Sequence, residues 1–168
     1  MFLPLLTGRV LRVATSVFFL PIVPQILFRE ISFGSDQYLH ARALRDEILR
    51  APLGLPLSQD DLQGEADQLH FGLFDDDKLA ACVTAIALTA DHAKIRQTAV
   101  ATAYQRQGLG RRTMTQLEAA LVARGFVSLS LHARSTAVGF YEKLGYETVG
   151  DEFIEVTIPH RKMVKRLT

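Results

Sequence analysis

The stretch that decides the fold is Gln105-Arg106-Gln107-Gly108-Leu109-Gly110, which follows a β-type segment at 93–101 and opens a helical pattern at 111–124. The first backbone amides of a helix have no partner within it, and the helix dipole favours negative charge there. The two glycines let a ligand approach the backbone closely, and Arg106, Arg111 and Arg112 add positive charge. The pattern therefore predicts a phosphate-binding turn at a helix start.

The same turn is compatible in principle with three other roles. Glycines also occur in tight turns that bind nothing, and this structural role stays open on the turn alone. A phosphate-loop NTPase is disfavoured because its signature requires a lysine, and the turn contains none. The dinucleotide fingerprint GxGxxG is disfavoured because position 113 is Thr113, and because several strands precede the turn.

Outward from the turn, strand and helix patterns alternate along the chain. We expect a strand, a helix, three strands, a helix, a strand, a helix and two strands. The ranges are strand 26–33, a helix capped by Ser35 or Asp36, a loop at 51–61, strands 68–74, 79–89 and 93–101, helix 111–124, strand 126–132, a short helix from Ser135 to Gly145, and two strands within 146–167 interrupted at Gly150 and Pro159. The first helix is expected to turn Leu39, Ala43, Leu44 and Ile48 toward the core. This order predicts an α/β or α+β domain with a mixed sheet.

Composition restricts the class of protein. The 168 residues are enough for one domain with its own core, and a net charge of +1 leaves no electrostatic footprint for nucleic acid. The one cysteine, Cys82, lies in an apolar run and is expected to be a packed core thiol. Neither a CxxC pair nor a His/Cys cluster is present, so no metal site is predicted and a reducing cytoplasm fits best. The acidic run at 75–78 is expected to be a solvated hairpin turn.

The N-terminal residues differ in composition from the rest. Arg9 and Arg12 precede an apolar stretch at 13–28, as in a signal peptide, but Pro21 and Pro24 interrupt it. The stretch is short for a membrane span and lacks a small-residue cleavage site. We expect residues 1–25 to be an extension of the domain at 26–168, with a membrane anchor as the less favoured alternative.

Two motifs, in this order along the chain, resemble those of a known family. Gln105, Gly108 and Gly110 fit the pattern [QR]xxGx[GA], and residues 132–146, which end in Phe140-Tyr141-Glu142-Lys143-Leu144-Gly145-Tyr146, match a second segment. The chain from about residue 26 onward resembles the GNAT superfamily of N-acetyltransferases, and the ending at 158–163 resembles its small stand-alone members. The resemblance implies a mostly antiparallel central sheet with helices on both faces and a V-shaped splay between strands four and five, here 93–101 and 126–132.

The resemblance also implies a ligand, acetyl-coenzyme A, held in the gap between the splayed strands. Its pantetheine arm would pair with the backbone near Ala99, Val100 and Ala101, and the amide of Val100 would polarise the thioester carbonyl. Its pyrophosphate would rest on the amides from Arg106 to Arg111. The residues implied to bind the coenzyme are Ala99, Val100, Ala101, Gln105, Arg106, Gln107, Gly108, Leu109, Gly110, Arg111 and Phe140.

For the chemistry, the resemblance implies direct attack of an amine on the thioester, with Tyr141 as the acid that protonates the leaving thiolate. The alternative is that Tyr141 only packs beside its helical neighbours. The general base stays open, because Glu155, His160, His132 and ordered water all meet the simple requirements. Ser135 stands where many members carry asparagine, and it is expected to cap the helix that follows.

Two functions are compatible with these residues. The first is transfer of an acetyl group from acetyl-coenzyme A to a primary amine, with a small molecule favoured over a protein as acceptor. The second is a non-catalytic module that binds or senses acyl-coenzyme A. The partners are then acetyl-coenzyme A and an amine, without nucleic acid or membrane, and an exposed sheet edge near the C-terminus suggests a homodimer.

Overall fold

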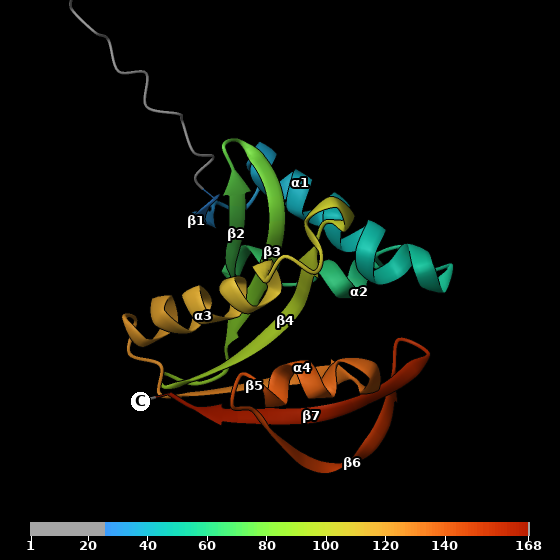
Figure 1. The fold of residues 1–168 in the computed structure, drawn as a ribbon, viewed down its shortest axis with the longest axis vertical. Coiled ribbons are helices and arrows are strands. Elements are labelled where there is room, and N and C mark those ends of the chain that lie inside the picture. The colour runs from blue at the N-terminus through green and yellow to red at the C-terminus, as the bar shows by residue number, and fades with distance from the viewer. Residues whose placement is uncertain (1–25, 168) are drawn as a thin grey trace, which may run out of the picture.

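The computed structural model describes residues 26–167, so the prediction of an extension at 1–25 lies outside the described residues. These residues form one seven-stranded sheet in the order β1-β2-β3-β4-β5-β7-β6 (Figure 1). The strands are β1 (Ile26–Ile31), β2 (Leu69–Asp75), β3 (Lys78–Ala87), β4 (His92–Val100), β5 (Ser128–Arg134), β6 (Glu147–Glu155) and β7 (Ile158–Arg166). The α-helices are α1 (Asp36–Arg45), α2 (Gln59–Leu62), α3 (Leu109–Val122) and α4 (Val138–Glu142). The predicted order of strands and helices is confirmed, as is the mixed sheet.

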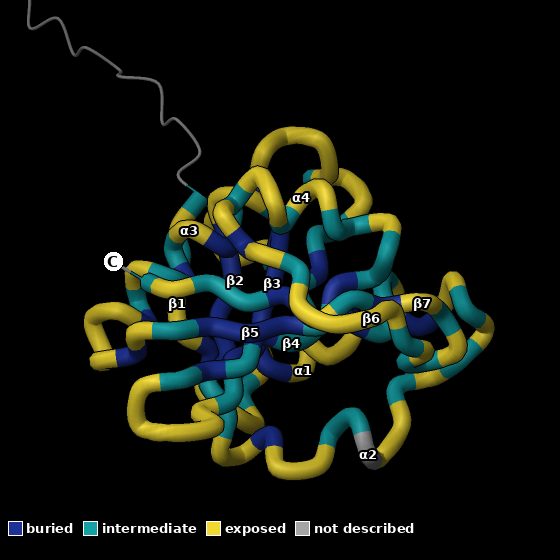
Figure 2. Tube along the Cα trace, turned by 90° about the horizontal axis from the view of Figure 1, so that it is seen from below, coloured by how far each residue is buried: buried dark blue, intermediate teal, exposed yellow. Residues whose placement is uncertain are grey.

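Helices cover both faces of the sheet. The side of β3 that carries Val83 and Ala85 packs against Met114 and Leu117 of α3. Cys82 lies on the opposite side, because side chains alternate along a strand, and it packs against residues of α1. Figure 2 shows the buried residues gathered in the central strands, whereas β6 is mostly exposed. The core therefore consists of two layers separated by the sheet.

The sheet splits between β4 and β5, which are its one parallel pair among the described residues. Pairing between them runs from His92 to Ile95 and stops there, and the strands then diverge toward their C-terminal ends (Figure 1). At the same level the register between β3 and β4 shifts, and Gln97 takes a left-handed conformation with a φ of 53°. A β-bulge at Gln97 thus bends β4 away from β5. The predicted V-shaped splay is confirmed.

The bulge is held by a buried ion pair that the sequence did not reveal. Arg45 of α1 donates to both carboxylate oxygens of Glu65, at 2.5 and 3.0 Å, and Tyr38 donates to Glu65 at 2.7 Å. Both members of the pair are 1% exposed. The Arg45 guanidinium also donates to the side chain of Gln97. A buried charge pair therefore supports the strained residue at which β4 departs.

The first helix presents a different face from the one expected. Leu39 is 52% exposed and Ala43 is also exposed, whereas Tyr38, Ala41 and Leu44 are buried. The prediction for Leu39 and Ala43 is wrong because the buried stripe includes Tyr38 and Arg45, whose polar ends are satisfied by Glu65. The expected N-cap is confirmed, since the Ser35 hydroxyl accepts a hydrogen bond from the amide of Tyr38.

Several local predictions need correction. The segment at 51–61 is not a plain loop, because a 3-10 turn (Ala51–Leu53) and the capped start of α2 lie in it. Ser135 does not cap α4, since its hydroxyl donates to Glu152 at 2.6 Å. The last two strands are separated by Val156 and Thr157, which have φ values of 48° and 65°, and not by Pro159, which lies within β7.

Two further observations concern Cys82 and the helices. Burial raises the pKa of Cys82 to about 12, and the prediction of a packed core thiol is confirmed. Among the described residues, no helix combines the length and the apolar character needed to cross a membrane.

Candidate active site

The phosphate turn has the amides that the sequence predicts. Gly108, with a φ of 79°, occupies the N-cap of α3. The first backbone hydrogen bond of this helix is the one that the Arg112 amide donates to the Gly108 carbonyl at 3.0 Å. Within the described part of the chain, the amides from Arg106 to Arg111 have no backbone acceptor. The left-handed conformation at Gly108 explains that glycine, and the open amides fit an anion.

The two motifs recognised in the sequence meet in space. A Cβ atom at Gly110 would lie 3.5 Å from the ring of Phe140 and 3.7 Å from Val100, which are ordinary van der Waals distances. The fold itself therefore has room for a Cβ atom at Gly110. Phe140 is 36% exposed and packs edge-on against Tyr141 at 5.0 Å.

The end of β4 turns one residue's backbone toward the splay. Ala101 donates its amide to Ala80 of β3 at 2.9 Å, so Ala99 and Ala101 both face β3. The amide and carbonyl of Val100 point the other way, where β5 has diverged, and the Val100 carbonyl accepts from the Gln105 side chain at 3.0 Å. Of the three residues predicted to meet the pantetheine arm, Val100 is the one whose amide faces the gap.

A cavity of about 310 Å³ opens where β4 and β5 diverge. Its walls come from β4, β5, β6, β7, α2, α4 and the chain between α1 and α2. Tyr141, Glu155 and His160, the three residues predicted for catalysis, all line it, and so does His132. These four residues come from separate elements, and the fold brings them into a single cavity.

Tyr141 is half-buried in α4 and stacks edge-on against Tyr146, with the ring centroids 5.8 Å apart. Burial raises the pKa of Tyr141, and a hydrogen bond with the Thr98 side chain offsets part of that increase. The phenol is therefore protonated at neutral pH.

The two histidines and Glu155 form the wall opposite β4. The Nδ1 atom of His132 lies 3.1 Å from both carboxylate oxygens of Glu155. The Nδ1 atom of His160 lies 2.9 Å from the carbonyl oxygen of Ile158. With its ring proton on Nδ1, each histidine donates to that oxygen and keeps Nε2 as an acceptor.

Cationic residues in the cavity were missed by the sequence analysis. Lys94 and Arg96 of β4 and Arg134 of β5 all line the cavity, and Arg50 is paired there with Asp61 at 2.6 Å. A period-two pattern was present, because Lys94 and Arg96 alternate with the buried residues Ala93 and Ile95. That alternation would have placed both cations on one face of the strand. The described residues contain no cluster of three or more His, Cys, Asp or Glu side chains that could hold a metal ion.

Sequence comparison places most of the chain in an acetyltransferase family. The model of the acetyltransferase (GNAT) domain family matches residues 56–167. YyaT, an uncharacterized protein of Bacillus subtilis (strain 168), is 37% identical over 76 residues, which are 45% of this chain and 51% of YyaT. The uncharacterized N-acetyltransferase YjcF of the same organism is 27% identical over 138 residues, covering 80% of this chain and 96% of YjcF.

The same fold occurs in solved structures. An aminoglycoside 6'-N-acetyltransferase in complex with coenzyme A superimposes with a TM-score of 0.68, covering 85% of this chain and 98% of that chain. The two sequences are 16% identical, so this likeness concerns the fold alone.

Proposed function

The chain belongs to the GNAT acetyltransferase family, whose members take acetyl-coenzyme A as the acetyl donor, and we propose that it acetylates a primary amine on a small molecule. The amine attacks the thioester directly, and Tyr141 serves as the general acid. One observation carries the proposal: Tyr141, His132, Glu155 and His160 share a cavity at the point where β4 and β5 diverge.

The open amides from Arg106 to Arg111 support a pyrophosphate site at the start of α3. Arg106 and Arg111 are exposed beside these amides and supply positive charge. The amide of Val100 faces the splay and suits the thioester carbonyl, whose oxygen gains negative charge during attack. Acetyl-coenzyme A is a co-substrate in this scheme, and the protein supplies position and proton transfers.

The bond changes follow from these positions. The amine nitrogen forms a bond to the acetyl carbon, the carbon–sulfur bond breaks, and the sulfur takes a proton from the Tyr141 hydroxyl. The nitrogen gives up its excess proton to Nε2 of His132, which Glu155 orients through Nδ1. His160 is the second candidate base, since its Nδ1 atom is also occupied and its ring is buried.

A thiol-release assay against a library of amines tests this function. The protein is mixed with acetyl-coenzyme A and each amine, free coenzyme A is followed with a thiol reagent, and the product is identified by mass. We expect amine-dependent thiol release with a mass gain of one acetyl group on the amine. Saturable binding of acetyl-coenzyme A without thiol release from any amine would instead favour the non-catalytic module.

Three expectations from the sequence stay predictions. The domain bounds at 26–168 and a cytoplasmic location need a deletion series and cell fractionation. The homodimer would use the edge strand β6, where Val149 and Ile154 are 45% and 68% exposed. Sedimentation equilibrium tests it, with Ile154→Lys as the variant expected to shift the protein to monomer.

A further inference from the structure

The cavity beside Tyr141 contains more positive than negative charge. Among the described side chains that line it, four are cationic and two are carboxylates. The cations are Arg50, Lys94, Arg96 and Arg134, and the carboxylates are Asp61 and Glu155. An amine acceptor without an anionic group would not interact favourably with this excess of positive charge.

Both carboxylates already have partners. Arg50 donates to both oxygens of Asp61, at 2.6 and 3.3 Å, and both side chains are largely buried. Glu155 lies 3.1 Å from Nδ1 of His132. Burial lowers the pKa of Lys94, although the charge of Glu155 offsets part of this decrease, and the Nζ atom of Lys94 is 3.4 Å from Nδ1 of His132.

Arg96 and Arg134 are the two other guanidinium groups that line the cavity. Both are half-buried, and neither has a carboxylate partner among the side chains that the structure describes. Arg134 is fixed in place, because one guanidinium nitrogen donates to the Leu49 carbonyl at 2.6 Å. Burial, and then the charge of nearby Arg50, lower the pKa of Arg134. Half-buried guanidinium groups without a carboxylate partner are suited to binding an anion.

The anion cannot be the coenzyme's phosphate groups, because the open amides assigned to them lie at the start of α3, outside the cavity lining. Arg96 follows Lys94 along β4, and Arg134 follows His132 along β5, so both flank the two strands just where they part. Tyr141 lines the same cavity as both arginines, so an acceptor whose amine lies near Tyr141 shares the cavity with them.

We propose that the acceptor is a small amine that also carries an anionic group, a carboxylate or a phosphate, which Arg96 and Arg134 bind. This rests on the proposed function, since it names the acceptor of the same site. The guanidinium plane matches a carboxylate or phosphate with paired hydrogen bonds, which a lysine cannot reproduce.

Equilibrium binding tests the proposal independently of turnover. Isothermal titration in the presence of coenzyme A would compare ω-amino acids of two to six carbons with their carboxamides, and O-phosphoethanolamine with ethanolamine. Each amino acid and its carboxamide have a similar shape but differ in charge, and ethanolamine lacks the phosphate group altogether. We expect at least one anionic member to bind about 10- to 100-fold more tightly than its neutral partner, as charge-assisted hydrogen bonds provide. The carboxylate and phosphate arms identify which anion the site prefers.

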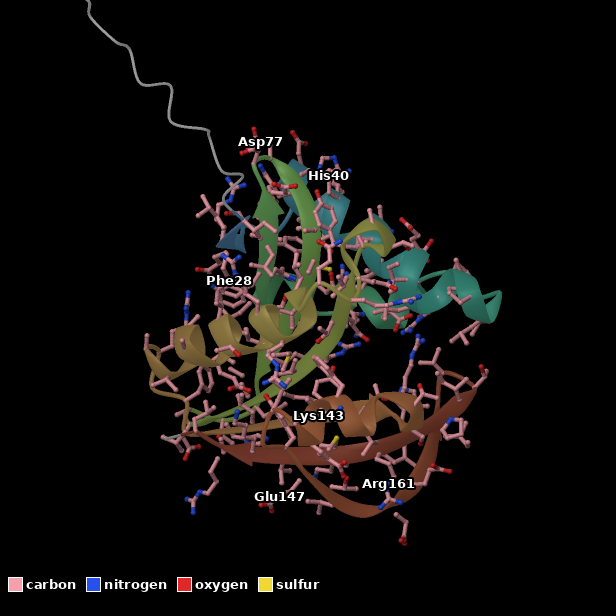
Figure 3. The ribbon with its side chains drawn as sticks, viewed as in Figure 1. Phe28, His40, Asp77, Lys143, Glu147 and Arg161 are labelled. Carbon is pink, nitrogen blue, oxygen red and sulfur yellow. The ribbon has the colours of Figure 1, made fainter. Side chains whose placement is uncertain are left out.

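The variants Arg96→Gln and Arg134→Gln should each remove most of this preference, while Arg96→Lys should keep part of it. Arg161→Gln is the matched control, because Arg161 lies on β7 but outside the cavity lining (Figure 3). Thermal melting confirms that each variant is folded. Neutral partners that bind as tightly as the anions, or a preference that persists in both glutamine variants, would overturn the proposal. Thiol release measured separately reports on the proposed function.

Discussion

Replacing Glu65 with Gln should destabilise the protein strongly, because it removes one charge of a fully buried pair while keeping its shape. The Arg45 guanidinium would lose its counter-charge at 2.5 and 3.0 Å in a site where both residues are 1% exposed. Breaking a buried ion pair in this way costs about 3 to 5 kcal/mol. Because domains have about 5 to 15 kcal/mol of stability, we expect a large fraction of the free energy of unfolding to be lost.

Urea unfolding followed by circular dichroism measures this loss, and an unchanged slope shows that a change in midpoint reflects stability. Glu30→Gln is the matched control, since Glu30 pairs with Arg124 at 2.6 Å but the two side chains are 48% and 35% exposed. An exposed pair contributes no more than about 1 kcal/mol. If Glu65→Gln costs as little as Glu30→Gln, the reasoning about the buried pair is refuted.

Acidification adds a second check with a defined sign. Burial would raise the pKa of Glu65, but hydrogen bonds from Arg45 and Tyr38 and the charge of Arg45 hold it below its ordinary value of 4.5. A carboxylate whose pKa is lowered by folding stabilises the protein above the ordinary value, and this contribution is lost as the pH falls through the lowered one. The stability difference between wild type and Glu65→Gln should therefore shrink on acidification below about pH 4.5.

Three further predictions concern the site and Cys82. Tyr141→Phe should leave the affinity for acetyl-coenzyme A nearly unchanged in calorimetry but lower turnover by about 100-fold, the effect of losing a general acid, and unchanged turnover would remove Tyr141 from the mechanism. Gly108→Ala and Gly125→Ala should each cost about 1 to 2 kcal/mol, because both glycines have positive φ, yet only the first should weaken coenzyme binding. Cys82 should react with a thiol reagent at pH 8 only as fast as the protein unfolds, since burial raises its pKa to about 12, and rapid labelling of the native protein would contradict this.

The phosphate turn was predictable from the sequence, whereas the bulge at Gln97 was not. Gly108 marks a left-handed backbone because other residues avoid it, and the second motif fixed the position of Tyr141. Glutamine carries no such signal, and Gln97 adopts its conformation because tertiary contacts impose it. The pair of Arg45 with Glu65 was equally hidden, since charged residues twenty positions apart are normally solvated.

The bulge at Gln97 divides β4 into two functional halves. Before it, Ala93 and Ile95 pack toward α3, so Lys94 and Arg96 face the cavity. After it the alternation is reversed: Ala99 packs toward α1, and Thr98 contacts Met114 of α3. In the proposed function, the first half of β4 would face the acceptor and the second half, with the Val100 amide, would face the thioester. Because Arg45 and Glu65 hold Gln97 in place, a loss of that pair should reduce acetyl transfer by more than the loss of folded protein explains.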